Sequence, residues 1–138
     1  MLFRSREDLG RELEALEERY PRFLELDREM KALATRWQRR EIAGAPLAND
    51  HGDPAYDFPI LEALIVEVHP EVEQLFIASD AIRRATAPYR ARLASAIARL
   101  TDGDIDSFTG TKVDSYHTVW FELHEYLLTV LGKERGGE

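Results

Sequence analysis

The chemistry available to this chain depends on its four histidines, because the sequence contains no cysteine. Without cysteine there is no disulfide, no thiol nucleophile and no cysteine-ligated zinc or iron–sulfur centre. Imidazole and carboxylate groups on neighbouring helices can still hold a divalent metal. The residues that we expect to form such a metal site are His69, Glu73, Asp114, His117 and His124.

The spacing of these residues indicates two ligand pairs on two different helices. His69 and Glu73 are four residues apart, which places them on one helical face. Asp114 and His117 are three residues apart and share a face in the same way. His117 and His124 are about 10.5 Å apart along a helix, so they do not readily share one ion. The alternative for each histidine is a buried imidazole that hydrogen-bonds to a neighbour, and this is the commoner case.

A second feature is a cluster of arginines in an otherwise acidic chain. The formal net charge is −8, which argues against nucleic-acid binding. Residues 81–101 nevertheless contain no acidic residue and five arginines. We expect the acidic first helix or a second copy of the chain to neutralise them, and a phosphate or nucleic-acid contact is the weaker alternative. This basic face consists of Arg83, Arg84, Arg90, Arg92 and Arg99.

The apolar pattern of the first third of the chain predicts helices. Apolar residues spaced four, three and four apart predict a helix from about Ser5 to Tyr20, and Pro21 begins a second helix or kinks a single one from Ser5 to Ala43. The second part has a heptad seam, which favours packing against another chain. The predicted interaction surface is Phe23, Leu26, Met30, Leu33 and Trp37.

A loop and a long helix are expected next. Residues 44–57 are rich in Gly, Pro and Asp and contain His51, so they predict a loop. Helical spacing then continues from an N-cap at Asp57 to Leu100, passing through Pro70 and Pro88. A helix of this length would measure about 60 Å, more than a compact domain of this size needs. We therefore expect the prolines to fold it back, or a second copy of the chain to cover it.

The last predicted helix runs from about Val113 to Leu131 and ends at Gly132, after a loop over residues 101–112. Its apolar surface is broad, which is typical of a helix buried in the middle of a bundle. The remaining residues, 133–138, predict a disordered polar tail. With 138 residues the chain fits one domain, and we expect an all-α bundle of four or five helices over residues 1–132, with long Pro-kinked antiparallel arms.

Composition also bears on the compartment and on function. The first residues include no signal-peptide pattern and no apolar run approaches the ~20 residues of a membrane span, so we expect a cytoplasmic protein. Fifteen arginines against three lysines indicate a bacterial origin. Since no complete catalytic motif is present, the favoured function is a non-catalytic interaction module, as a homodimer or a small subunit of an assembly. The alternatives are the metal- or small-ligand-binding bundle and the contact through the basic face.

Overall fold

The computed structural model describes residues 6–135, and it confirms the predicted all-α class. Helices account for most of this range, and a single two-stranded hairpin interrupts them. Among the described residues, no helix combines the length and the apolar character that crossing a bilayer requires. The elements are α1 (Arg6–Gln38), β1 (Arg39–Ile42), β2 (Ala45–Ala48), α2 (Pro54–Glu62), the π-helical η1 (Ala63–Val68), α3 (His69–Ile77), α4 (Asp80–Thr101), α5 (Asp106–Thr109) and α6 (Tyr116–Leu131).

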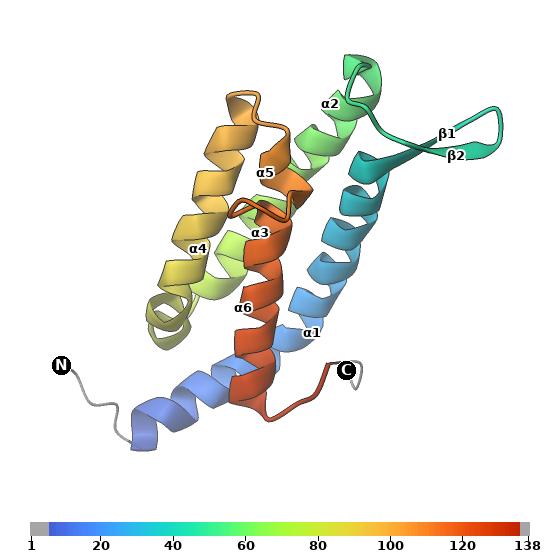
Figure 1. Cartoon of the computed structure of the whole chain (residues 1–138). Helices are drawn as coiled ribbons and strands as arrows, with labels where there is room; N and C mark the ends of the chain where they lie inside the picture. Colours follow the sequence, from blue (N-terminus) through green and yellow to red (C-terminus); the bar gives the residue numbers. More distant parts are fainter. Residues whose placement is uncertain (1–5, 136–138) are drawn as a thin grey trace.

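The helices form one bundle with the hairpin projecting from it (Figure 1). The chain runs up α1, passes through the hairpin and returns along α2, η1 and α3 as one continuous helical stretch. The next long helix, α4, follows this stretch, and α6 packs against both α1 and α4. The N-terminal part of α1, blue in Figure 1, extends beyond the bundle at the end opposite the hairpin.

The first helix is continuous through Pro21, so the single-helix alternative is the correct one. The predicted start at Ser5 lies outside the described residues. The helix ends at Gln38, earlier than the expected end near Ala43, because Arg39–Ile42 pair with Ala45–Ala48 instead. The prediction of an unstructured loop starting at residue 44 is therefore wrong over the residues that form β2.

The hairpin turns through the two residues Ala43 and Gly44. Both have positive φ, 53° and 79°, which is the conformation of a type I′ turn. Glycine adopts it freely, whereas alanine does so at a cost. The turn lacks the Asn-Gly or Asp-Gly pair that is typical of type I′ turns. For this reason the sequence pattern alone predicts a loop here.

The long apolar stretch after the hairpin starts earlier than expected and folds back at a different place. The N-cap is Asp53, whose carboxylate accepts a hydrogen bond from the Ala55 backbone, rather than Asp57. Pro70 and Pro88 both lie within helices, and the chain reverses at Ser79, which is extended with φ −128° and ψ 131°. Thus neither proline folds the chain back, and no second copy is needed to cover a 60 Å helix.

The π-helical turn η1 precedes Pro70 and keeps one apolar ridge directed at the core. In a regular α-helix, positions four residues apart overshoot one turn by about 40°, so a ridge with this spacing drifts around the axis. In η1 the His69 N–H bonds back to the carbonyl of Leu64, five residues earlier, and this wider turn reverses the drift. The buried ridge is Ile60, Leu64, Val68, Val72 and Phe76.

The C-terminal helix is buried, as predicted. It begins at Tyr116 with Ser115 as its N-cap, three residues later than the expected start at Val113. It ends at Gly132, whose φ of 67° is the left-handed conformation of a helix C-cap. Arg135, in the expected tail, donates to Glu125 at 2.8 Å, and residues 136–138 lie outside the described range.

Candidate functional site

The predicted interaction surface lies inside the chain's own core. All five residues of the heptad seam are at most 7% exposed. The Phe23 ring stacks on Trp120 with centroids 5.2 Å apart, and Trp37 packs on Phe108 at 5.7 Å. Most of the seam is therefore covered by α6 and α5, although Leu33 also lines a groove at the surface. The sequence pattern could not separate these cases, because a bundle core and a dimer seam have the same spacing. The residues of this seam are Phe23, Leu26, Met30, Leu33 and Trp37.

In each predicted ligand pair, at least one side chain bonds to a residue outside the pair. The Nδ1 atom of His69 lies 3.0 Å from the Tyr116 hydroxyl. Burial lowers the pKa of His69, partly offset by the nearby charge of Glu73, and burial raises the pKa of Tyr116. The tyrosine is thus the donor and the neutral imidazole the acceptor. Glu73 accepts from Arg90 at 3.4 Å and does not turn toward His69 as a ligand.

Two of the other predicted ligands, Asp114 and His124, also have partners of their own. Asp114 is paired with Arg92, and this hydrogen bond lowers the pKa of the carboxyl group. His124 is buried, with its Nε2 atom 2.8 Å from the Tyr20 hydroxyl. Burial and the charge of Lys31 lower the pKa of His117. Within residues 6–135, no three His, Asp or Glu side chains gather to hold a metal ion.

The basic face is neutralised by nearby acids rather than by the first helix. Arg83 and Arg90 pair with acids of α3 and α4, and Arg92 binds the carboxylates of both Asp114 and Glu122. Arg99 donates to the Ser107 hydroxyl and to a backbone carbonyl. The exposed Arg84 completes the set. The expectation of an internal counterpart is met, but the counterpart consists of Glu73, Asp80, Asp114 and Glu122.

The base of the hairpin contains a polar network that the sequence analysis did not predict. The last carbonyls of α1 need donors because the helix ends there. Asn49 supplies two of these donors: its side-chain amide bonds Trp37 O at 2.8 Å and its backbone N–H bonds Gln38 O at 2.9 Å. The hydroxyl of Tyr56 lies 2.8 Å from the carbonyls of both Arg36 and Arg39. We call Trp37, Asn49, His51, Tyr56 and Asp57 the hairpin root.

Asn49, His51 and Asp57 of the root complete one another's hydrogen bonds. The second N–H of the Asn49 amide donates to Asp57 Oδ1 at 2.7 Å, and the amide oxygen accepts from the His51 backbone at 3.1 Å. The Nδ1 atom of His51 donates to Asp57 Oδ2 at 2.9 Å. These bonds hold His51 at φ 60°, which is a rare backbone conformation for this residue type. The network therefore fixes the hairpin relative to the bundle.

The contact with Asp57 also orients the His51 ring. An ionised carboxylate can only accept, so Nδ1 is the nitrogen that donates in this bond. The imidazole packs on Trp37, with ring centroids 4.2 Å apart. No periodic pattern relates Asn49, His51 and Asp57, since they lie in irregular chain around a helix start. The one signal in the sequence is the number of Asn and Asp residues in this loop, because their side chains can hydrogen-bond to the backbone.

Above the root, one face of the hairpin is apolar and exposed. Residues paired across the strands point to the same face, and Arg40 pairs with Leu47 while Ile42 pairs with Ala45. Ile42 is 50% exposed and Leu47 is 48% exposed. We call Arg40, Ile42, Ala45 and Leu47 the hairpin face. Its base is covered by Tyr56, whose ring lies under the Arg40 guanidinium at 4.4 Å.

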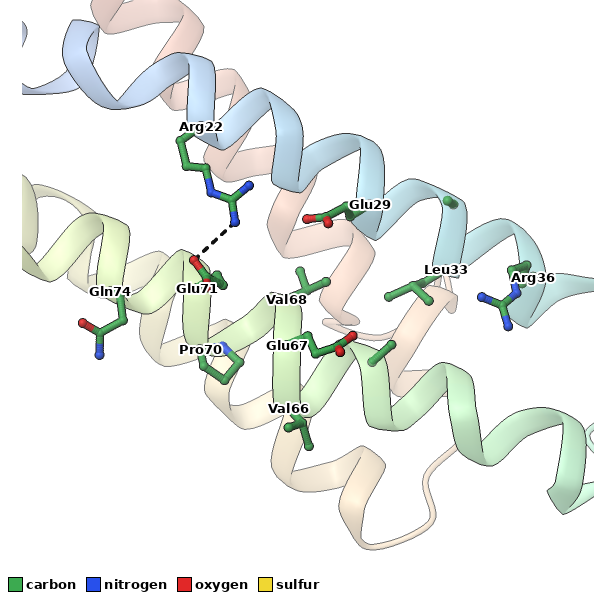
Figure 2. Close-up of a pocket in the computed structure, with 12 residues that line it drawn as sticks. Arg22, Glu29, Leu33, Arg36, Val66, Glu67, Val68, Pro70, Glu71 and Gln74 are labelled. Carbon is green, nitrogen blue, oxygen red and sulfur yellow. Dashed lines mark hydrogen bonds and ion pairs between the residues drawn. The ribbon is translucent and has the colours of Figure 1, made fainter.

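A groove runs between α1 and the η1–α3 stretch, with a volume of about 690 Å³ (Figure 2). Arg22, Glu29 and Arg36 line it from α1, and Glu67 and Glu71 line it from the opposite side. We call it the α1–α3 groove. Its Arg36 end adjoins the hairpin root, because the Arg36 carbonyl lies in hydrogen-bonding distance of the Tyr56 hydroxyl.

The chain matches no family model, no curated protein and no solved structure. The features of the structure that bear on function are therefore the hairpin root, the hairpin face and the α1–α3 groove. Two of them are surfaces, and the third is the scaffold that holds one of these surfaces in place.

Proposed function

We propose that this chain is a non-catalytic interaction module that forms a homodimer through the hairpin face. The single observation that carries the proposal is the pair Ile42 and Leu47, each about half exposed on the same side of a projecting hairpin. Burying apolar surface of this kind is the main favourable contribution to association. A monomer would leave both side chains in water.

The hairpin root supports this proposal because it makes the hairpin rigid. An isolated two-stranded hairpin is at best marginally stable in water. Here Asn49 and Tyr56 tie it to the last carbonyls of α1, and Asp57 is itself bonded to Asn49. A surface that is ordered before binding loses less entropy when it docks. The buried network thus favours presentation of Ile42 and Leu47 to a partner.

Docking is expected through the face rather than through either strand edge. Next to a two-residue turn, the pair Ile42–Ala45 is hydrogen-bonded, so the nitrogen of Pro46 points to the outer edge of β2. That edge therefore lacks a donor at this position, a common protection against strand addition. The Tyr56 hydroxyl lies against the outer edge of β1 at the Arg39 carbonyl.

A second copy of the chain is the partner that the charges favour. In a two-fold interface the same patch meets itself, so a patch that carries both signs of charge can pair with its own copy. Arg40 is bonded to Asp53 at 3.2 Å, so both signs of charge occur at the base of the hairpin face. With two hairpins antiparallel, Ile42 and Leu47 of one copy pack on the Tyr56 ring and the Arg40 stem of the other.

Sedimentation equilibrium over a range of concentrations tests the homodimer. The wild type is expected to dimerise, and Ile42→Asp combined with Leu47→Asp is expected to give a monomer with an unchanged melting temperature, since both residues are half exposed. The matched control is Ile105→Asp combined with Val113→Asp, which changes two similarly exposed apolar residues outside the hairpin. A monomeric wild type, or equal loss of the dimer in the control, would contradict the proposal.

A further inference from the structure

The α1–α3 groove has an apolar floor and open rims. Leu33 and Val68 form part of the floor and are 7% and 4% exposed. Val66 stands on the rim and is 63% exposed. Figure 2 shows Arg22, Glu29 and Arg36 along α1 and the facing side chains of η1 and α3 below them. A groove with a buried apolar floor and solvent-accessible walls has the shape that receives an amphipathic helix.

The π-helical turn contributes to this shape. Val66 and Glu67 lie in η1, directly before Pro70. The ring of a proline clashes with the carbonyl four residues earlier, here that of Val66, and the wider π turn accommodates it. Such turns occur often at functional sites. In this chain the turn places Val68 on the floor of the groove and leaves Val66 at its rim.

The groove is long enough for several turns of helix. Arg22 and Arg36 mark its two ends on α1, and at 1.5 Å per residue they are about 21 Å apart along the axis. This length matches a helix of roughly four turns.

The charges along the groove indicate what kind of helix it accepts. At one end Arg22 pairs with Glu71 at 3.3 Å, the dashed contact in Figure 2. In the middle, neither Glu29 nor Glu67 has a hydrogen-bond or ion-pair partner among residues 6–135. At the far end stands Arg36. The centre of the groove therefore offers two carboxylates to a cation above an apolar floor.

We propose that the α1–α3 groove binds a basic amphipathic helix of a partner protein. Apolar residues of this helix, spaced three and four apart, pack on Leu33 and Val68, and its Lys or Arg side chains pair with Glu29 and Glu67. The partner is thus distinct from the second copy that the hairpin face is proposed to bind. The inference does not depend on the homodimer, because the two surfaces are made of different residues.

Fluorescence anisotropy with a labelled helical peptide tests this inference. The probe has about 16 residues, enough to fill the groove, with leucines three and four apart and flanking lysines. A matched peptide has glutamates in place of the lysines. The lysine peptide is expected to bind the wild type more weakly as salt increases, and the glutamate peptide is expected not to bind. Equal binding of both peptides, or of neither, would overturn the proposal.

Two sets of variants locate the site. Glu29→Gln combined with Glu67→Gln is expected to weaken binding of the lysine peptide roughly three- to tenfold, as the loss of two exposed ion pairs predicts. Glu14→Gln combined with Glu17→Gln makes the same change in net charge on exposed residues outside the groove, and it should leave the affinity nearly unchanged. The same loss in both double variants would show only a nonspecific charge effect and would refute the site.

A third variant separates the groove from the hairpin. Val66→Arg places a large cation on the rim, and since Val66 is mostly exposed the fold should be retained. This variant is expected to abolish binding of the lysine peptide and to leave the dimer intact. The combined Ile42→Asp and Leu47→Asp variant is expected to do the reverse. Full binding of the peptide to Val66→Arg would rule out the groove whatever the oligomeric state.

Discussion

Two of the places where the described residues bury polar side chains serve different purposes. One is the hairpin root. The other is a cluster in the helical core, where the Trp120 indole donates to Asp27 at 2.9 Å and His124 Nε2 lies 2.8 Å from the Tyr20 hydroxyl. We call Tyr20, Asp27, Trp120 and His124 the core cluster. Its members come from α1 and α6, which are about a hundred residues apart in sequence.

The two places differ in which groups need a partner. In the core cluster the backbone is already bonded within α1 and α6, so the side chains satisfy one another. In the hairpin root the side chains of Asn49 and Tyr56 satisfy backbone carbonyls where α1 ends. The core cluster therefore adds to the stability of the whole bundle, whereas the root determines the orientation of one projecting element. Variants at the two places should separate global unfolding from local loosening.

The largest effect is expected for Trp120→Ala. It removes a fully buried indole and leaves the Asp27 carboxylate without this donor, so we expect a loss of about 3–5 kcal/mol in the free energy of unfolding. Urea denaturation followed by circular dichroism measures this loss. The neighbouring Phe121→Ala, at a residue that is half exposed, should lose far less. If the two variants unfold at similar urea concentrations, the buried indole does not stabilise the bundle in this way.

A smaller and more local effect is expected for Asn49→Ala. This variant leaves the carbonyl of Trp37 without its Asn49 donor and removes one of the two side-chain donors to the Asp57 carboxylate, which costs about 1–3 kcal/mol. Hydrogen exchange should accelerate in residues 39–48 more than in α6, and dimerisation should weaken with it. The control is Asp50→Ala, since Asp50 is exposed and its carboxylate accepts from the Gly52 backbone. Uniform acceleration across the bundle would contradict a local role for the root.

The smallest effect is a dependence of stability on pH at His69. Burial holds the folded pKa of His69 below the 6.5 of the unfolded chain, so the unfolded state binds protons more readily. Stability is therefore expected to fall as the pH decreases below about 6.5 and to level off once the folded imidazole is also protonated. His117, whose pKa is also lowered by burial, acts in the same direction.

Thermal melts of the wild type and of His69→Gln between pH 7.5 and pH 5 measure this dependence. Glutamine can still accept the hydrogen bond of Tyr116 but does not titrate, so the variant should lose part of the slope while keeping much of the stability at neutral pH. A slope that is the same in both proteins would assign the pH dependence to other groups. His51→Gln provides a comparison at the hairpin root.

Much of the helical core could be predicted from periodicity alone. The ridge of α1 and the broad apolar surface of α6 were both identified, because burial on a helix requires apolar residues three and four apart whichever element covers them. The same argument explains the main error in the candidate site. Phe23 and Trp37 were assigned to an interface with another chain, but α6 and α5 cover them. Periodicity shows that a face is covered and does not show by what.

Apolar periodicity could not predict the hairpin or the hairpin root. Its strands are four residues each and mostly exposed, so they carry no apolar alternation. Its stability comes from contacts such as that of Asn49 with the end of α1, which join irregular segments with no common spacing. The reversal at Ser79 is similar, because one extended residue redirects the chain where two prolines had been expected to do so.

The sequence by itself determined the all-α class, the absence of cysteine chemistry, the acidic balance and which helix faces are buried. These properties depend on composition and on the spacing of residues that are close in sequence, so they do not depend on which segments meet. The tertiary structure alone decided that the heptad seam is mostly internal, that most arginines of the basic face already have partners, and that Ile42, Leu47, Glu29 and Glu67 remain accessible. Those properties depend on which segments meet, and segments distant in sequence meet only after the chain has folded.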